Sequence, residues 1–178
     1  GKTAHLLELA DLDLTALDAD PERLVRVTET LQRLRLQART VAADASQPAN
    51  WWDGQPFDAI LLDAPCSASG IVRRHPDVRW LRRDTDIAAL ARTQDAILNA
   101  MWPLLKPGGH LLYCTCSVFR SEGEDTVQAF LQRNTDARML PSPGHLIPGK
   151  IPTGLPVEHN ALGEHDGFYY ALLEKDRD

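Results

Sequence analysis

Apolar residues in this chain form short unbroken runs that alternate with longer stretches of helical spacing. Unbroken apolar runs are typical of strands buried on both faces, and we predict strands over residues 12–17, 39–43, 59–62, 111–116 and 168–174. Helical spacing predicts helices over residues 4–9, 22–35, 84–102 and 121–132. Strands that alternate with helices in this way predict an α/β fold with a doubly wound sheet.

The polar residues between these stretches predict where the elements begin and end. Asp84 is placed to cap the long helix, and Ser121 with Glu124 has the spacing of a capping box. Residues 107–109, Pro-Gly-Gly, predict a turn. Residues 141–167 are rich in proline and glycine without periodicity, so we predict mostly loop there.

Length and composition suit one globular domain, residues 1–178, with a sizeable core. The net charge of −6 gives no global attraction to nucleic acid or to a membrane. Three cysteines argue against a disulfide scaffold, and we expect a cytoplasmic, monomeric protein. No apolar run reaches the roughly 18 residues of a membrane span. Because the chain begins at Gly1 rather than at methionine, we expect a piece of a longer protein.

Acidic residues follow three successive predicted strands, at Asp18, Asp44 and Asp63. Ligands of open parallel sheets bind at the carboxyl ends of the strands, and an acid there can hold ribose hydroxyls. This pattern predicts a nucleoside-bearing cofactor. Asp18 could instead cap the following helix, a role open to Asp20 as well, and Asp44 could be an ordinary loop carboxylate.

Two predicted strands end in thiols. Asp63 and Cys66 follow the strand at residues 59–62, whereas Cys114 and Cys116 lie at the end of the next parallel strand. Residues two apart share a face of a strand, so we expect Cys114, further inside, to be core and Cys116 to be the better nucleophile. A zinc site formed by the three cysteines with His75 or His110 is an alternative, although the spacing matches no known ligand pattern.

A basic loop follows Cys66 in this acidic chain. Such a loop can be an ordinary solvated surface, or it can contact phosphate groups. Its cationic and histidine residues are Arg73, Arg74, His75, Arg79, Arg82 and Arg83.

The two cysteine motifs identify a family resemblance. Residues 63–67, Asp-Ala-Pro-Cys-Ser, and residues 113–117, Tyr-Cys-Thr-Cys-Ser, resemble the RNA cytosine-5 methyltransferases that use S-adenosylmethionine. The closest branch is RsmB (Fmu/Sun), and the resemblance also covers residues 1–3, 16–20, 43–45, 73–77 and 166–171. The family has alanine where this chain has Cys114. Its first strand, most of its glycine loop and its amino-terminal RNA-binding domain would precede Gly1.

The resemblance implies a fold, a reaction and a partner. The fold would be the Rossmann-like class I methyltransferase fold, truncated at its amino-terminal strand and glycine loop. The reaction would be S-adenosylmethionine-dependent methylation of cytosine C5 in 16S rRNA, at a site of the cytosine 967 type. Neither a metal nor a membrane is implied. A sheet that lacks its central strand should be poorly stable by itself.

The resemblance also implies the role of each catalytic residue. Cys116 would add to cytosine C6 as a thiolate, because C5 alone is a poor nucleophile. Asp63 would supply a proton or hydrogen bond to N3. Cys66 would assist product release. Since the basic loop directly follows Cys66, we expect Arg73, Arg74 and Arg79 to contact the RNA backbone near the target base.

Cofactor contacts follow from the same motifs. Gly1 and Lys2 would lie near the methionine end of S-adenosylmethionine. Asp18 would bind the ribose, Asp44 the adenine side, and Asp63 would complete the cofactor site.

Two other functions fit parts of the sequence. A P-loop nucleotidase would use residues 1–3 as the tail of a Walker A loop and residues 60–63 as Walker B. That interpretation leaves both cysteine motifs unexplained and lacks a carboxylate at residue 64. A non-enzymatic RNA-binding or scaffold fragment of the same fold is the second alternative.

Overall fold

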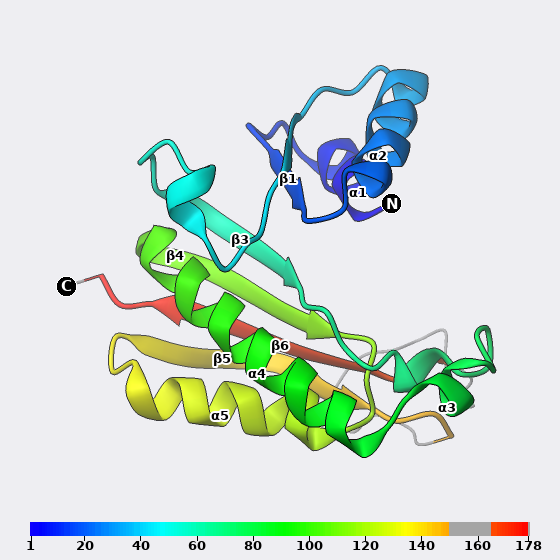
Figure 1. Cartoon of the computed structure of the whole chain (residues 1–178). Helices are drawn as coiled ribbons and strands as arrows, with labels where there is room; N and C mark the ends of the chain where they lie inside the picture. The colour runs from blue at the N-terminus through cyan, green and yellow to red at the C-terminus, as the bar shows by residue number, and fades with distance from the viewer. Residues whose placement is uncertain (150–164, 178) are drawn as a thin grey trace. The chain divides into compact units, whose positions relative to one another are not determined.

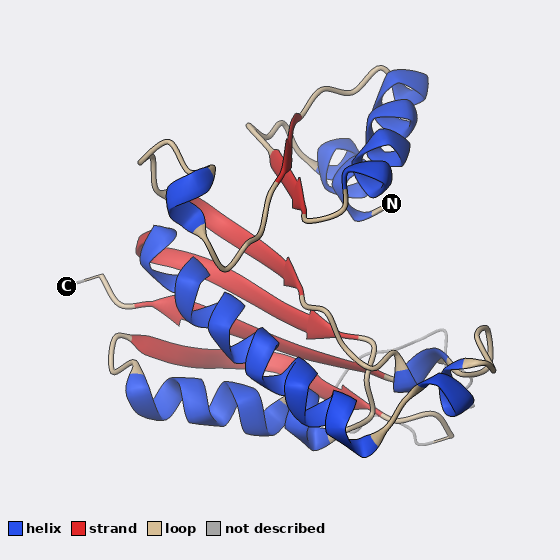
Figure 2. Ribbon diagram, in the orientation of Figure 1, coloured by secondary structure: helices blue, strands red, loops and turns tan. Residues whose placement is uncertain are grey.

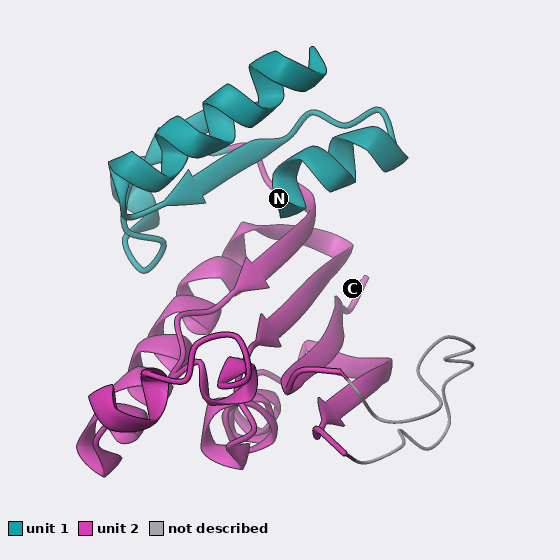
Figure 3. Cartoon of the chain, turned by 90° about the vertical axis from the view of Figure 1, so that its right-hand side faces the viewer, with its two compact units in different colours: residues 1–54 teal, residues 55–178 magenta. Residues whose placement is uncertain are grey.

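The computed structural model describes residues 1–149 and 165–177. The chain divides into two compact units, residues 1–54 and 55–178 (Figure 3). Each unit has its own sheet among the described residues.

In the first unit, helices alternate with strands. Helix α1 (Lys2–Leu9) precedes β1 (Thr15–Asp18), α2 (Pro21–Leu34), β2 (Arg39–Ala42) and a 3-10 turn, η1 (Pro48–Asn50). Strands β1 and β2 pair in parallel, with Asp18 opposite Ala42. The two predicted strands therefore lie side by side. Strand β1 begins at Thr15, three residues later than predicted.

The start of α2 separates the roles of the two acids that precede it. Asp20 is the N-cap, and its side chain accepts a 2.9 Å hydrogen bond from the Glu22 N–H. Pro21 occupies the first helical position, where its fixed φ suits the helix and its missing N–H costs nothing. Asp18 is therefore not needed as the cap of this helix.

The second unit contains a mixed four-stranded sheet (Figure 2). Its strands are β3 (Phe57–Asp63), β4 (Leu105–Thr115), β5 (Ala137–Leu146) and β6 (Phe168–Lys175), in the order β3-β4-β6-β5. Strands β3 and β4 are parallel, while β6 is antiparallel to both of its neighbours. The connections contain η2 (Ser69–Ile71), α3 (Val78–Leu81), α4 (Asp84–Met101), η3 (Trp102–Leu104), η4 (Arg120–Glu122) and α5 (Glu124–Arg133).

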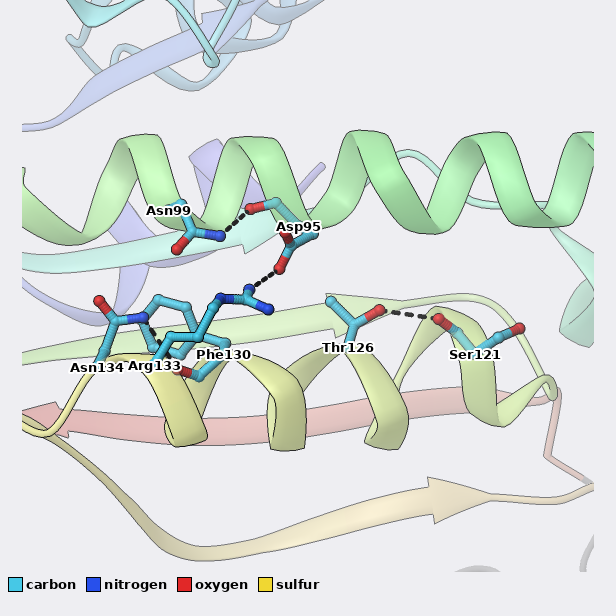
Figure 4. Close-up of polar contacts among 7 residues, drawn as sticks. All are labelled: Asp95, Asn99, Ser121, Thr126, Phe130, Arg133 and Asn134. Atoms are coloured by element: carbon cyan, nitrogen blue, oxygen red, sulfur yellow. Dashed lines mark hydrogen bonds and ion pairs between the residues drawn. The ribbon is translucent and has the colours of Figure 1, made fainter.

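Helices α4 and α5 lie side by side over one face of this sheet (Figure 1). Leu98 and Phe130 from these helices are fully buried, as is Leu111 from β4. Burial of each such side chain contributes roughly 1.5–3 kcal/mol, so this core holds both helices on β4. At the outer seam, Arg133 of α5 forms an ion pair with Asp95 of α4 (Figure 4).

For the first long helix of this unit the predicted start at Asp84 was right and the predicted cap was wrong, and for the second helix the predicted start was wrong. Helix α4 is capped by Arg83, and the side chain of Asp86 accepts the Arg83 N–H at 3.0 Å. Asp84 is thus already helical. Helix α5 begins at Glu124 and not at Ser121, because residues 120–122 form a separate 3-10 turn that directs Glu122 into the interior.

Two predicted irregular segments are partly strand. Residues 107–109 lie within β4, where a register shift opposite residues 57–59 of β3 accommodates them. The predicted loop over residues 141–167 was wrong at its start, because β5 continues to Leu146 with a register shift at Gly144. The cross-strand pairing with β6 overrides the local proline and glycine content. Residues 150–164 of that loop lie outside the described residues.

Candidate active site

Two thiols meet at the carboxyl ends of β3 and β4. The sulfur atoms of Cys66 and Cys116 lie 3.4 Å apart, within hydrogen-bond distance, and both residues are half-buried. The parallel pairing of β3 and β4 explains why the sulfur atoms meet. Asp63 stands opposite Cys114, so the segments that follow the two strands leave the sheet at the same edge. The structure therefore brings together the two cysteines that the sequence placed 50 residues apart.

Backbone hydrogen bonds continue beyond the last paired residues of the strands. The Ala64 N–H donates to the Cys114 carbonyl at 2.9 Å, and the Gly70 N–H donates to the Cys116 carbonyl at 2.9 Å. Between these two bonds, Pro65 has no N–H to donate, so the chain leaves the ladder and turns. The segment that carries Cys66 is consequently held against the segment that carries Cys116.

The two thiols are not equivalent. The hydrogen bond to Cys116 and, to a lesser extent, burial raise the pKa of the Cys66 thiol far above its usual value. Cys66 is therefore a protonated thiol at neutral pH and can donate to the sulfur of Cys116. Such an arrangement stabilises negative charge on Cys116.

Asp63 and Cys114 form a second contact at this edge. Asp63 is exposed, and the Cys114 thiol donates to its Oδ1 at 3.6 Å. Cys114 itself is only 4% exposed, as expected for a core residue. The carboxylate of Asp63 is exposed at the same strand end as Cys66.

A buried carboxylate that the sequence analysis missed lies beneath the thiols. Glu122 is fully buried and accepts hydrogen bonds from the Ser67 N–H and from the Ser67 and Ser117 hydroxyls. A glutamate in a polar 3-10 segment gives no periodic signal, so the sequence did not indicate its burial. The serines that follow each cysteine were visible in the motifs, but not their shared partner.

A hydrogen-bonded chain extends this network into α4 and β4. Gln94 donates to the Pro65 carbonyl at 2.8 Å and to Glu122 at 3.4 Å, and the Tyr113 hydroxyl donates to Gln94 at 3.1 Å. Burial raises the pKa of Tyr113 well above its usual value, so its hydroxyl stays a neutral donor. The one detectable signal was Gln94, a polar residue on the apolar side of the predicted helix.

The basic loop is tied to the rest of the second unit. Arg73 and Arg74 both pair with the buried Asp166, at 3.4 Å and 2.7 Å, while about two-thirds of each arginine side chain stays exposed. Arg82 donates to the Ser67 carbonyl at 3.0 Å, which fixes the end of the loop beside the thiols. No local pattern in the sequence indicated Asp166 as the partner of these arginines.

The surface of this loop also carries an aromatic side chain. Trp80 in α3 is 87% exposed and lies next to Arg79. Exposed aromatic and cationic side chains together are typical of surfaces that bind single-stranded nucleic acid.

In the first unit, Asp18 is the last residue of β1, and Asp44 lies two residues after the end of the adjacent parallel strand β2. Asp18 is half-exposed, and one of its oxygens accepts the Asp20 N–H at 2.9 Å. Hydrogen bonds from the Ser46 hydroxyl and N–H hold the pKa of the Asp44 carboxyl below its usual value. Lys2 is the first residue of α1, and Gly1 is its N-cap.

Within residues 1–149 and 165–177, no three or more His, Cys, Asp or Glu side chains gather as metal ligands would. Over the same residues, no helix has the length and apolar character needed to cross a membrane.

Comparison with known proteins places these motifs in a family. The model of the family described as 16S rRNA methyltransferase RsmB/F matches residues 1–174. The chain belongs to this family. It is 51% identical to ribosomal RNA small subunit methyltransferase B of Vibrio vulnificus and 52% identical to that of Vibrio cholerae, over 98% of its own length. It spans about 40% of the length of these relatives.

Solved structures confirm the fold of this RsmB/F family member. The crystal structure of NSun6 from Pyrococcus horikoshii with SFG is 28% identical, with a TM-score of 0.78 over 100% of this chain and 46% of that one. The Rossmann-like α/β methyltransferase fold expected from the resemblance is thus confirmed. The P-loop nucleotidase interpretation is set aside, because family membership accounts for the two cysteine motifs that it left unexplained.

Proposed function

We propose that this chain carries the catalytic residues of an S-adenosylmethionine-dependent RNA methyltransferase that modifies cytosine C5 in 16S rRNA, at a site of the cytosine 967 type. The observation that carries the proposal is the pair of sulfur atoms 3.4 Å apart at the ends of β3 and β4. Cytosine C5 becomes a nucleophile only after a group adds to C6. Two thiols in contact, at a sheet edge that also carries an exposed carboxylate, suit that addition and its reversal. Membership in the RsmB/F family supports rRNA as the substrate.

In the proposed mechanism, Cys116 adds first. Its sulfur forms a bond to C6 of cytosine, and the C5=C6 electron pair becomes available at C5. Charge develops at N3, and we assign Asp63 to supply the hydrogen bond or proton that this atom then needs. The S–H of Cys66 stabilises the Cys116 thiolate before it attacks.

Release reverses the addition. The C5–H bond breaks, its proton passes to water, and its electron pair re-forms the C5=C6 bond. The C6–S bond breaks in the same step and returns Cys116 as a thiolate. Any proton that Asp63 gave to N3 returns to Asp63. Cys66 is placed to stabilise this leaving thiolate through its own S–H, so we assign it to product release.

We propose an S-adenosylmethionine site of the expected kind on this chain. When bound, the cofactor supplies the methyl group that C5 accepts. We propose that Asp18 binds the ribose and that Asp44 lies on the adenine side, because both lie at the carboxyl ends of adjacent parallel strands. We also propose that Gly1 and Lys2 contact the methionine end of the cofactor, and that Asp63 is a further cofactor contact.

The direct test is nucleoside analysis of methylated RNA. The full-length gene product that contains this chain should transfer methyl groups from S-adenosylmethionine to unmodified 16S rRNA, with 5-methylcytidine as the product. RNA and cofactor binding without any methylated nucleoside would favour the inactive RNA-binding alternative. A different methylated nucleoside would contradict the proposed chemistry.

The basic loop is the proposed RNA contact, with Arg73, Arg74 and Arg79 near the target base. At physiological salt the Debye length is about 8 Å, so these arginines outweigh the distant carboxylates of an acidic chain. Arg73 and Arg74 have a second task, because they neutralise the buried Asp166. We also propose that residues 1–178 act as one catalytic domain, as a monomer in the cytoplasm.

Arg79→Ala therefore separates RNA binding from loop stability. We expect RNA affinity to fall about 3- to 10-fold, with cofactor affinity unchanged. The slope of log affinity against log salt concentration should become shallower by about one, because one fewer phosphate is neutralised. Lys106→Ala is the matched control, because Lys106 lies near the opposite end of β4 and pairs with Asp58. Salt-dependent RNA titrations of both variants check this. Equal losses in both, or an unchanged slope for Arg79→Ala, would place the RNA elsewhere.

A further inference from the structure

Glu122 connects the two segments that carry the thiols. One carboxylate oxygen accepts the Ser67 N–H at 2.7 Å, and the other accepts the hydroxyls of Ser67 at 2.5 Å and Ser117 at 2.6 Å. Ser67 directly follows Cys66, and Ser117 directly follows Cys116. A single side chain thus holds the residue next to each sulfur.

Because Glu122 is buried, its carboxylate requires the hydrogen bonds from these two segments. A fully buried carboxylate is strongly unfavourable unless donors satisfy it, and charge-assisted hydrogen bonds of this length are the strong kind. Three of its donors come from the two thiol segments, and the fourth is Gln94 at 3.4 Å. Burial of the Glu122 carboxylate is therefore favourable only when the Cys66 segment and the Cys116 segment both donate hydrogen bonds to it.

The backbone of Glu122 is anchored separately from its side chain. Its carbonyl accepts the Thr115 hydroxyl at 3.1 Å and shares the proton of the Tyr113 hydroxyl, 3.2 Å away, with Gln94. Both donors belong to β4, so the residue is fixed to the strand that ends at Cys116. The side chain extends from this fixed point to the Cys66 segment.

We propose that Glu122 is a positioning residue that sets the contact between the Cys66 and Cys116 sulfur atoms. Its role in catalysis rests on the proposed function, since it would act only through the two thiols. Reacting groups must be held close to their productive geometry, and small displacements cost large factors in rate. Ser67 and Ser117 are the donors through which Glu122 acts.

A cross-linking rate measures this positioning without reference to methylation. In the full-length protein with Cys114→Ala, the diazene oxidant diamide should join Cys66 and Cys116 in a disulfide. Two S–H bonds break, one S–S bond forms, and the diazene is reduced to the hydrazine. Mass spectrometry of the linked peptides gives the rate of this reaction.

We expect Glu122→Gln to slow the cross-link about tenfold or more, because an amide NH₂ then replaces one of the two oxygens that accept from the four donors. Methylation should lose kcat by about 100-fold, while KM for RNA changes less than about threefold. The double variant Ser67→Ala with Ser117→Ala should show the same pattern, and it provides the test if Glu122→Gln does not fold.

Thr126→Val is the matched control. It removes a buried hydroxyl from the neighbouring turn of α5, whose hydrogen bond goes to the Ser121 carbonyl and not to a thiol segment. This variant should keep the parental cross-linking rate even if its melting temperature falls equally. A parental cross-linking rate in folded Glu122→Gln would overturn the positioning role. A slowed cross-link in a protein whose parent never methylates RNA would support positioning and refute the proposed function.

Discussion

Replacement of Cys116 by alanine should lower methyl transfer by at least about 10³-fold and abolish any covalent RNA adduct, because no nucleophile then reaches C6. Cys66→Ala should instead still allow the adduct to form, although more slowly, and delay its breakdown. Without the Cys66 S–H, the leaving thiolate loses its hydrogen-bond donor. A protein–RNA band of reduced mobility should therefore accumulate in Cys66→Ala and be absent in Cys116→Ala, as measured on denaturing gels with the full-length protein.

Cys114→Ala is the control for the loss of a thiol. It removes a sulfur from the same strand, and alanine is the residue that the family resemblance places there. This variant should retain turnover with a modest loss of stability, because only one small buried group is removed. An adduct that accumulates in Cys116→Ala and is absent in Cys66→Ala would exchange the roles of these two cysteines. Normal turnover in both of these variants would refute thiol catalysis.

Gly70→Ala should be severely destabilising. A Cβ at residue 70 would lie 1.9 Å from the Gly167 carbonyl oxygen, a backbone atom that cannot move away without shifting its segment. The same contact carries a hydrogen bond from the Gly167 N–H to the Gly70 carbonyl at 2.7 Å. We expect a loss of more than about 3 kcal/mol in the free energy of unfolding, measured by chemical denaturation.

Ala68→Gly in the same loop should have a much smaller effect. Ala68 has a φ of 60°, in the left-handed region that favours glycine. Relief of this strain and the added flexibility of the unfolded chain nearly cancel, so stability should stay within about 1 kcal/mol of the parent. An equally stable Gly70→Ala protein would contradict the close approach of residues 70 and 167.

The parts of the site that the sequence predicted are those governed by local pattern. Apolar runs located β3 and β4, and parallel strands end at the same edge of a sheet, so Asp63, Cys66 and Cys116 were expected to lie together, as they do. Position at the end of a strand likewise led to the prediction that Asp18 and Asp44 contact the cofactor. The roles of these residues stay predictions until the variants are measured.

The parts that the sequence missed depend on partners distant along the chain. The burial of Glu122 follows from its contacts with Ser67 and Ser117, and one of these lies 55 residues away. Arg74 has the sequence context of a solvent-facing cation, yet it pairs with Asp166. Strand β5 was missed because its pairing with β6 prevails over a composition typical of loops.

The central claim, that Cys116 adds to C6 during methylation, has one decisive measurement. RNA that carries 5-fluorocytosine at the target position should trap the intermediate, because fluorine at C5 cannot leave as the proton does. With S-adenosylmethionine and the full-length protein, peptide mass spectrometry should find the methylated, fluorinated nucleotide attached to Cys116. Methyl transfer to ordinary RNA with no trapped adduct, or an adduct on Cys66 alone, would contradict the account.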